Sequence, residues 1–307
     1  MAPHPHAPVL ISVVVLTYNR SDALLRVLDA LGAQTDRGFE VIVADDGSRP
    51  EHAEAISAHA DRWPFALCHA WHPDRGFTAA AARNMGVRAA HGDYVVFLDG
   101  DCVPQPDFIA AHRRLARPGC FVNGSRILLD PDLTEQALLA PLPWLRDAPL
   151  TWLKQRLRGG CNKLGGLVFR WPAAFRACRR HFRWRGIRSC NLAVWRRDID
   201  AVDGFDQSFD GWGHEDADFV LRLHLAGCLR REGFWATEVL HLWHRQAARD
   251  DEAANRRRVV DRMATPGRGC RADIGLGFAT SGADERVQWL HAQPRSPETS
   301  AVRNAIT

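Results

Sequence analysis

Short apolar runs that alternate with helical patterns fill the first 129 residues of the chain. The apolar runs are rich in β-branched residues and each ends in a turn, the pattern of strands buried on both faces. They cover 9–16, 39–46, 65–71 and 94–99. Helical patterns lie between them at 21–31, 51–60 and 78–90. Strands in alternation with helices predict an α/β fold with a mostly parallel, Rossmann-like sheet flanked by helices.

The rest of the chain predicts fewer elements. We expect helices over 108–115 and 252–263, a helix opened by Gly211–Asp218 that runs to Ala226, and strands over 120–129, 189–195, 229–235 and 237–243. Ser21 and Asp22 are candidates to cap the first helix. Beyond Pro266 the pattern is poor, so we expect a disordered tail there.

The composition indicates which classes of protein the chain can belong to. The formal charge of +4 on 307 residues is mild and does not indicate a nucleic-acid binder. We see no apolar run long enough to span a bilayer and no signal-peptide pattern at 1–8. The eight cysteines are scattered without a Cys-x-x-Cys pair, so we expect free buried thiols rather than disulfides. The cytoplasm is the expected compartment.

Segment 154–197 contains no acid, while arginines, lysines and tryptophans accumulate in it. Two interpretations stay open. The segment is either an insertion with a solvated basic face, or a surface that docks on anionic lipid. The second interpretation would place the protein peripherally at the inner face of the membrane.

Two pairs of acids follow predicted strands. Asp45 and Asp46 end one strand, and Asp99 and Asp101 end another. Parallel strands bring their carboxyl ends to one edge of the sheet, where ligands bind in open α/β folds. Acids this close repel unless a cation offsets the charge, so we expect a divalent metal that carries a nucleotide diphosphate. Acids that only begin turns are the alternative.

Further charged residues are candidates for the same site. Arg83, on an alanine-rich helix, is placed to reach a phosphate or to fix Asp99, unless it lies on a solvated helix face. Glu215 and Asp216 begin a helix after a Gly-Trp-Gly loop, where the helix dipole favours ionised carboxylates. We expect both to be ionised near neutrality, as a general base requires, and Asp218 to be the solvated acid of the three.

His241 and His244 follow a predicted strand and offer imidazole ligands for a metal. Residues i and i+3 of a regular strand point to opposite faces, so both would share one ion only if the strand has already ended. We favour His244 as the ligand and keep His241 as a second candidate.

Seven motifs in the same order resemble the inverting family 2 glycosyltransferases of the GT-A fold, with a C-terminal half similar to the β-1,4-galactosyltransferases. The motifs are Val13–Arg20, Val43–Ser48, Ala82–Gly86, Phe97–Cys102, Cys190–Arg196, Gly204–Phe209 and Gly211–Asp218. The resemblance covers about 9–245 and implies a GT-A sheet with an acceptor-side subdomain. The implied segments are a nucleotide-sugar half at 1–129, a basic Trp-rich insertion at 130–188, an acceptor and catalytic half at 189–248, and a helix with a tail at 249–307.

The resemblance also implies roles for single residues. The residues that would bind the nucleotide are Thr17, Tyr18, Asn19, Arg20, Asp46, Arg83 and Asp99. Asp101 would coordinate Mn²⁺ or Mg²⁺, and His241 stands where the galactosyltransferases have a methionine ligand. Asp216 would deprotonate the acceptor hydroxyl, while Glu215 and Trp212 hold the acceptor sugar. His214 replaces a glycine that is usual in that loop.

The sequence therefore predicts a metal-dependent inverting transferase that moves a hexose or N-acetylhexosamine from a UDP-sugar to a glycan or lipid-linked acceptor, in synthesis of a bacterial surface polysaccharide or lipopolysaccharide. A nucleotidyltransferase is one alternative, although Thr17–Arg20 is not the glycine- and lysine-rich phosphate loop of that class. A non-catalytic sugar-binding module is another, although its paired acids would repel phosphates without a metal.

Overall fold

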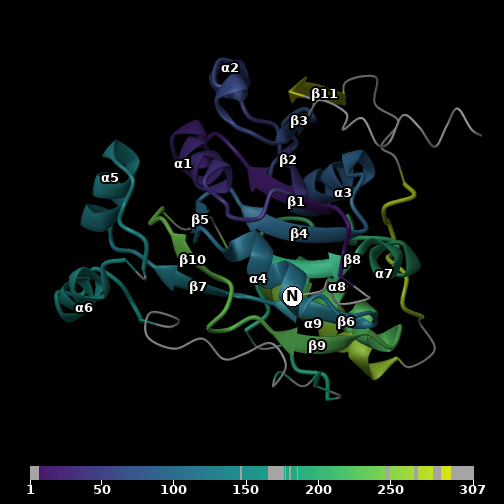
Figure 1. Cartoon of the computed structure of the whole chain (residues 1–307). Coiled ribbons are helices and arrows are strands. Elements are labelled where there is room, and N and C mark those ends of the chain that lie inside the picture. The colour runs from purple at the N-terminus through teal and green to yellow at the C-terminus, as the bar shows by residue number, and fades with distance from the viewer. Residues whose placement is uncertain are drawn as a thin grey trace, which may run out of the picture.

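An eight-stranded mixed sheet forms the centre of the chain, in the order β11-β3-β2-β1-β4-β8-β6-β9 (Figure 1). The computed structural model describes residues 7–145, 147–164, 176, 178–179, 181–184, 186–245, 249–265, 269–278 and 285–291. The strands are β1 (Ile11–Thr17), β2 (Phe39–Asp45), β3 (Ala66–Trp71), β4 (Tyr94–Asp99), β6 (Cys120–Asn123), β8 (Asn191–Trp195), β9 (Leu229–Glu232) and β11 (Arg286–His291).

Only β8 and β11 run against the other strands of this sheet. The prediction of an α/β fold with a mostly parallel sheet is therefore confirmed. The sheet is flanked by α1 (Ser21–Gly32), α2 (Pro50–Ser57), α3 (Ala79–Ala89), α4 (Phe108–Leu115), α7 (Arg196–Ala201) and α8 (Glu215–Leu225).

The core lies in two layers, one on each face of the sheet. On β1, Val13 and Val15 pack in one apolar cluster with residues of α1, α2 and α4, while Val14 packs in another with α3, α7 and α8. Successive side chains of a strand point to opposite faces, so a continuous apolar run supplies both clusters. This double burial explains why unbroken apolar runs, rather than alternating patterns, mark the central strands.

A second sheet of three strands lies beside the first, in the order β5-β10-β7 (Figure 1). Its strands are β5 (Cys102–Pro104), β7 (Ser125–Leu128) and β10 (Glu238–His241), and it packs against α5 (Pro131–Leu139) and α6 (Pro149–Leu157). Gly124 separates β6 from β7, so the single strand predicted over 120–129 is wrong. A Cβ at Gly124 would lie 2.0 Å from Asn191 Oδ1, and the chain can cross between the sheets only with glycine there.

The tail predicted to be disordered contains structure. Helix α9 (Glu252–Ala264) is followed by ordered residues at 269–278 and by β11, which pairs antiparallel with the edge strand β3. The prediction of disorder is wrong for these residues, while residues 292–307 lie outside the described part of the chain. The pattern missed β11 because the strand is largely exposed and its polar residues interrupt any apolar run.

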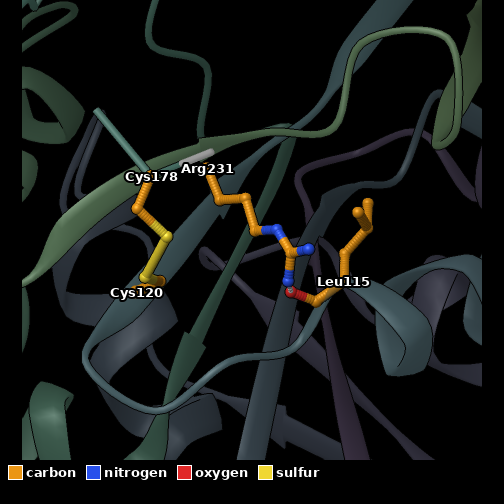
Figure 2. The surroundings of a disulfide bond; sticks show 4 residues. All are labelled: Leu115, Cys120, Cys178 and Arg231. Atoms are coloured by element: carbon orange, nitrogen blue, oxygen red, sulfur yellow. Dashed lines mark hydrogen bonds between the residues drawn. A yellow bond between two sulfur atoms is a disulfide. The ribbon is translucent and has the colours of Figure 1, made fainter. Parts of the chain in front are cut away.

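Cys120 and Cys178 form a disulfide, contrary to the expectation that all thiols are free (Figure 2). Beside it, the Arg231 guanidinium donates to the Leu115 carbonyl at 2.7 Å. The scattered spacing hid this pair because its partners are 58 residues apart in sequence.

Ser21 does not cap α1, since its hydroxyl lies 2.9 Å from His52 Nδ1 and the N-cap position is Arg20.

No helix in the described part of the chain is long and apolar enough to cross a membrane.

Candidate active site

One cleft of about 1420 Å³ opens at the carboxyl ends of the parallel strands. Twelve of the thirteen residues predicted for the site line it, and only Asn19 does not. The lining residues among them are Thr17, Tyr18, Arg20, Asp46, Arg83, Asp99, Asp101, Trp212, Glu215, Asp216, His241 and His244. The fold thus brings together side chains that are more than 200 residues apart in sequence.

Asp101, His241 and His244 form a cluster able to hold a metal ion. One ligand atom from each lies within 4.8 Å of the others. The Nε2 atoms of His241 and His244 lie 3.8 and 3.2 Å from carboxylate oxygens of Asp101. Strand pairing builds the cluster, because His241 lies opposite Cys102 in the β10–β5 ladder and Leu242 N–H donates to the Asp101 carbonyl at 2.9 Å.

Both histidines reach the same carboxylate because β10 ends at His241. The chain beyond it leaves the strand direction, and the alternation that would separate residues i and i+3 no longer applies. Burial lowers the pKa of His241, which keeps the ring neutral and able to coordinate. Two imidazoles and one carboxylate form a donor set that suits a divalent transition metal.

Arg83 joins the two halves of the cleft. It is 3% exposed and donates to Asp99 Oδ1 at 3.2 Å and to Glu215 Oε1 at 3.1 Å. Burial opposes its charge, but the two carboxylates outweigh that effect and raise the pKa of Arg83. Of the roles considered from sequence, fixing Asp99 is confirmed, and the solvated helix face is excluded. Asp99, half-buried beside this cation, has a raised pKa because desolvation outweighs the attraction of Arg83.

The catalytic candidate Asp216 lies in the first turn of α8, after a loop with unusual backbone angles. Gly211, Gly213 and His214 have φ values of 68°, 110° and 69°. Ser189 N–H donates to Asp216 Oδ2 at 3.3 Å. Burial, followed by the charge of Glu215, raises the pKa of Asp216 to about 7. The expectation that Asp216 is fully ionised near neutrality is wrong, because desolvation exceeds the effect of the helix dipole.

Asp218 is not the solvated acid of this helix. It is 0% exposed and forms ion pairs of 2.7 Å with both Arg222 and Arg262. Local pattern could not predict the pairing with Arg262, because Arg262 lies on α9, far along the chain.

On the nucleotide side, Asp46 is held by neighbours. It accepts from Thr78 N–H at 3.0 Å and from Thr78 Oγ1 at 2.5 Å, and His72 Nε2 lies 3.2 Å away. Tyr18 is 47% exposed, and its hydroxyl donates to Asp74 at 2.9 Å. These contacts fix the cleft wall where a base and ribose would lie.

Asn19 and Arg20 differ in position. Asn19, at φ 51°, shapes the turn after β1: its N–H donates to Ser48 Oγ, and its side chain accepts from Arg49 N–H. Its predicted contact with a nucleotide is not supported by the cleft lining. Arg20 lines the cleft and pairs with Asp22 at 2.9 Å.

Sequence reasoning missed several lining residues. Arg126 on β7 lies in the cleft, and a lone arginine in a short strand gave no signal. Trp184 and Arg188 come from the segment interpreted as a basic surface, and Arg249 and Arg256 come from the region around α9. The run of Trp and Arg in the sequence marked the first two, but the pattern could not show that they face a cleft.

Comparisons with known proteins agree with this architecture. A family model described as Glycosyl transferase family 2 matches residues 12–144, and one described as the N-terminal domain of galactosyltransferase matches residues 170–244. Validoxylamine A glucosyltransferase of Streptomyces hygroscopicus subsp. jinggangensis is 30% identical over 260 residues, covering 77% of this chain and 56% of the relative. Chondroitin synthase of Escherichia coli is 27% identical over 242 residues, 72% of this chain and 33% of the synthase.

Among solved structures, GalNAc-T7 with UDP, GalNAc and Mn²⁺ superposes with a TM-score of 0.56 at 15% identity, covering 83% of this chain and 48% of that one. This likeness shows a shared GT-A fold. The chain spans about half the length of the first of the relatives above, 56%. The two matched models follow one another along the chain, and residues 12–144 belong to glycosyl transferase family 2.

Proposed function

We propose that this chain catalyses metal-dependent transfer of a sugar from a nucleotide-sugar donor to a hydroxyl of a glycan or lipid-linked acceptor, with inversion at the anomeric carbon. The observation that carries the proposal is the placement of the Asp101–His241–His244 cluster and Asp216 in one cleft. A UDP-hexose or UDP-N-acetylhexosamine is the proposed donor, supported by a similar fold solved with UDP, GalNAc and Mn²⁺.

The residues of the cleft have different roles in the proposed reaction. Asp101, His241 and His244 would hold Mn²⁺, which when bound offsets negative charge on the leaving diphosphate. Arg83 keeps Asp99 in place beside them. Thr17, Tyr18 and Asp46 line the region proposed for the nucleoside. Asp216 takes the proton of the acceptor hydroxyl as the oxygen attacks the anomeric carbon and the bond to the diphosphate breaks. A single displacement of this kind inverts configuration.

The role of Asp216 is tested by Asp216→Asn. The amide has the same shape but cannot accept the proton, so transfer should fall by about 10²- to 10⁴-fold, while UDP binding stays unchanged. The measurement is UDP-sugar turnover with an accepted glycan, beside titration with UDP and Mn²⁺. Asp132→Asn, the same change on the exposed surface of α5, is the matched control. Full transfer by Asp216→Asn would remove this residue as the base.

The metal site is tested by Asp101→Ala. Loss of the carboxylate should abolish the Mn²⁺-dependent part of UDP binding, measured by calorimetric titration with and without a chelator. Asp61→Ala, at an exposed position of the 3₁₀ turn Ala60–Arg62, should bind UDP and Mn²⁺ like the unchanged protein. Unaltered titration of Asp101→Ala would refute the assignment.

The same measurements separate the alternatives. A nucleotidyltransferase would release pyrophosphate from a nucleoside triphosphate. A non-catalytic module would bind sugar, but it would not hydrolyse UDP-sugars in the presence of Mn²⁺, whereas a transferase does so slowly.

The chondroitin synthase relative supports a further proposal, that the product belongs to a bacterial surface polysaccharide or lipopolysaccharide. Docking on an anionic membrane surface stays a prediction, because no observation tests it and residues 165–175 of the segment that motivated it lie outside the described residues.

A further inference from the structure

The wall of the cleft around Asp216 is built from aromatic rings backed by guanidinium groups. The Arg256 guanidinium lies 5.8 Å from the ring centre of Trp184, and that of Arg249 lies 4.6 Å from the ring centre of Trp212. Both distances fall within the range of cation–π contacts. Both arginines and both tryptophans line the cleft. A flat ring with a polar edge is a common platform for a sugar, so this wall has the form of a sugar subsite.

The wall is held in place from behind. Trp184 packs against the apolar cluster of Phe209, Ala217, Leu221 and Val259, which joins α8 to α9. Its ring centre lies 5.5 Å from that of His214. His214 keeps a left-handed φ of 69°, a conformation that is strained for a residue with a side chain. The chain thus holds a strained histidine against Trp184, immediately before Glu215 and Asp216.

On this side of the cleft, some arginines have no carboxylate partner among the described residues. Glu215 is paired with the buried Arg83 at 3.1 Å, and Arg249 has Glu252 at 3.8 Å. Within the described part of the chain, neither Arg188 nor Arg256 has a carboxylate as an ion-pair partner. Arg188 adjoins Ser189, whose amide contacts Asp216. Two exposed guanidiniums therefore lie in the same cleft as Asp216.

We propose that this subsite, formed by Trp184, His214, Arg188 and Arg256, selects an acceptor sugar that carries a negative charge. The inference rests on the proposed function and names its acceptor class. The charge would be a carboxylate, as on a uronic acid, or a phosphate, as on a phosphosugar, because guanidinium binds both in the same bidentate manner. Arg83 and the metal cluster are assigned to the donor, whereas Arg256 contacts Trp184 and Arg188 adjoins Ser189, whose amide contacts Asp216.

The test compares matched probes on the full chain in the presence of UDP and Mn²⁺. p-Nitrophenyl β-glucuronide is measured against p-nitrophenyl β-glucoside, and glucose 6-phosphate against glucose, by ligand-observed NMR or calorimetry. At least one charged probe should bind about tenfold or more tightly than its neutral partner. The advantage should shrink as salt is raised, because the two arginines are exposed. The glucuronide pair reports on a carboxylate source, and the phosphate pair on a phosphate source.

Variants assign the effect to the subsite. Arg256→Gln and Arg188→Gln should each cut the preference for the charged probe several-fold, whereas Arg256→Lys keeps the charge and should retain most of it. Arg257→Gln is the matched control, since Arg257 is the next residue on α9, is exposed and does not line the cleft. Melting temperatures establish that every variant is folded.

The outcomes separate this inference from the proposed function. If UDP and Mn²⁺ bind and the donor is hydrolysed, yet neither charged probe binds better than its neutral partner, the acceptor inference is overturned and the transferase proposal stands. A preference that survives both glutamine variants also overturns it. If UDP with Mn²⁺ does not bind at all, the proposed function itself fails.

Discussion

At the centre of the cleft, the buried guanidinium of Arg83 bonds to two carboxylates, while the nearby carboxylate of Asp216 forms no ion pair with a described residue. Arg83 bonds to Asp99 and Glu215. Asp216 accepts a backbone N–H from Ser189 but has no ion-pair partner within the described residues. Burial therefore raises the pKa of Asp216 to about 7. A carboxylate poised near neutrality is a stronger proton acceptor than an ordinary one, and it is still ionised in a large share of molecules.

The raised pKa of Asp216 predicts the pH dependence of transfer. Only the ionised carboxylate accepts a proton, so kcat/KM should rise about tenfold per pH unit below about 7 and level off above it. The measurement is a pH profile of kcat/KM for UDP-sugar transfer.

Metal ligands must be deprotonated to bind, so UDP–Mn²⁺ affinity is measured over the same pH values. If the fall in transfer only follows the fall in UDP–Mn²⁺ affinity, the profile reports the metal ligands, and the assignment to Asp216 fails.

At the scale of elements, buried ion pairs fasten α8 to α9. Arg262 on α9 lies 2.7 Å from Asp218 on α8 and 3.1 Å from Asp206. Arg222 lies 2.7 Å from the other oxygen of Asp218. All four side chains are at most 3% exposed. The network fixes the helix that begins with Glu215 and Asp216 relative to the helix that carries Arg256.

Breaking this network should be costly. Arg262→Met leaves Asp206 and Asp218 buried with fewer counter-charges, and removal of one partner from a buried ion pair costs about 3–5 kcal/mol. Urea unfolding of the variant measures the loss. Arg257→Met, on the exposed face of the same helix, should change the free energy of unfolding by less than about 0.5 kcal/mol. Equal stability of the two variants would mean that the network adds nothing to folding.

At the scale of the whole molecule, the sequence predicted what depends on local pattern and on strand order. Apolar runs marked the central strands, and parallel strands carry Asp46, Asp99 and Asp101 to one edge without further information. Features that depend on distant partners were not predictable. The burial of Asp218 depends on Arg262, and the sharing of a carboxylate by His241 and His244 depends on where β10 ends.

The sheet edge shows a further limit of local pattern. Residues 286–291 carry too weak an alternation to predict a strand. Without β11, however, β3 would be an edge strand with unpaired N–H and C=O groups, and an extended segment can pair with such an edge. β11 takes that place, from Arg286 opposite Trp71 to His291 opposite Leu67, and Trp289 stacks on His91 with ring centres 5.0 Å apart. Pairing to an existing edge thus creates a strand that the segment's own residues do not specify.

This arrangement predicts that β11 protects the molecule from association. A chain that ends at Phe278 lacks β11 and exposes the hydrogen-bonding groups of β3, which should pair with other copies. Light scattering after size exclusion should then show larger species than for the full chain, together with a lower melting temperature. A chain that ends at His291 keeps β11 and should elute like the full chain. If the shorter chain elutes and melts like the longer one, the edge needs no cover and β11 has another role.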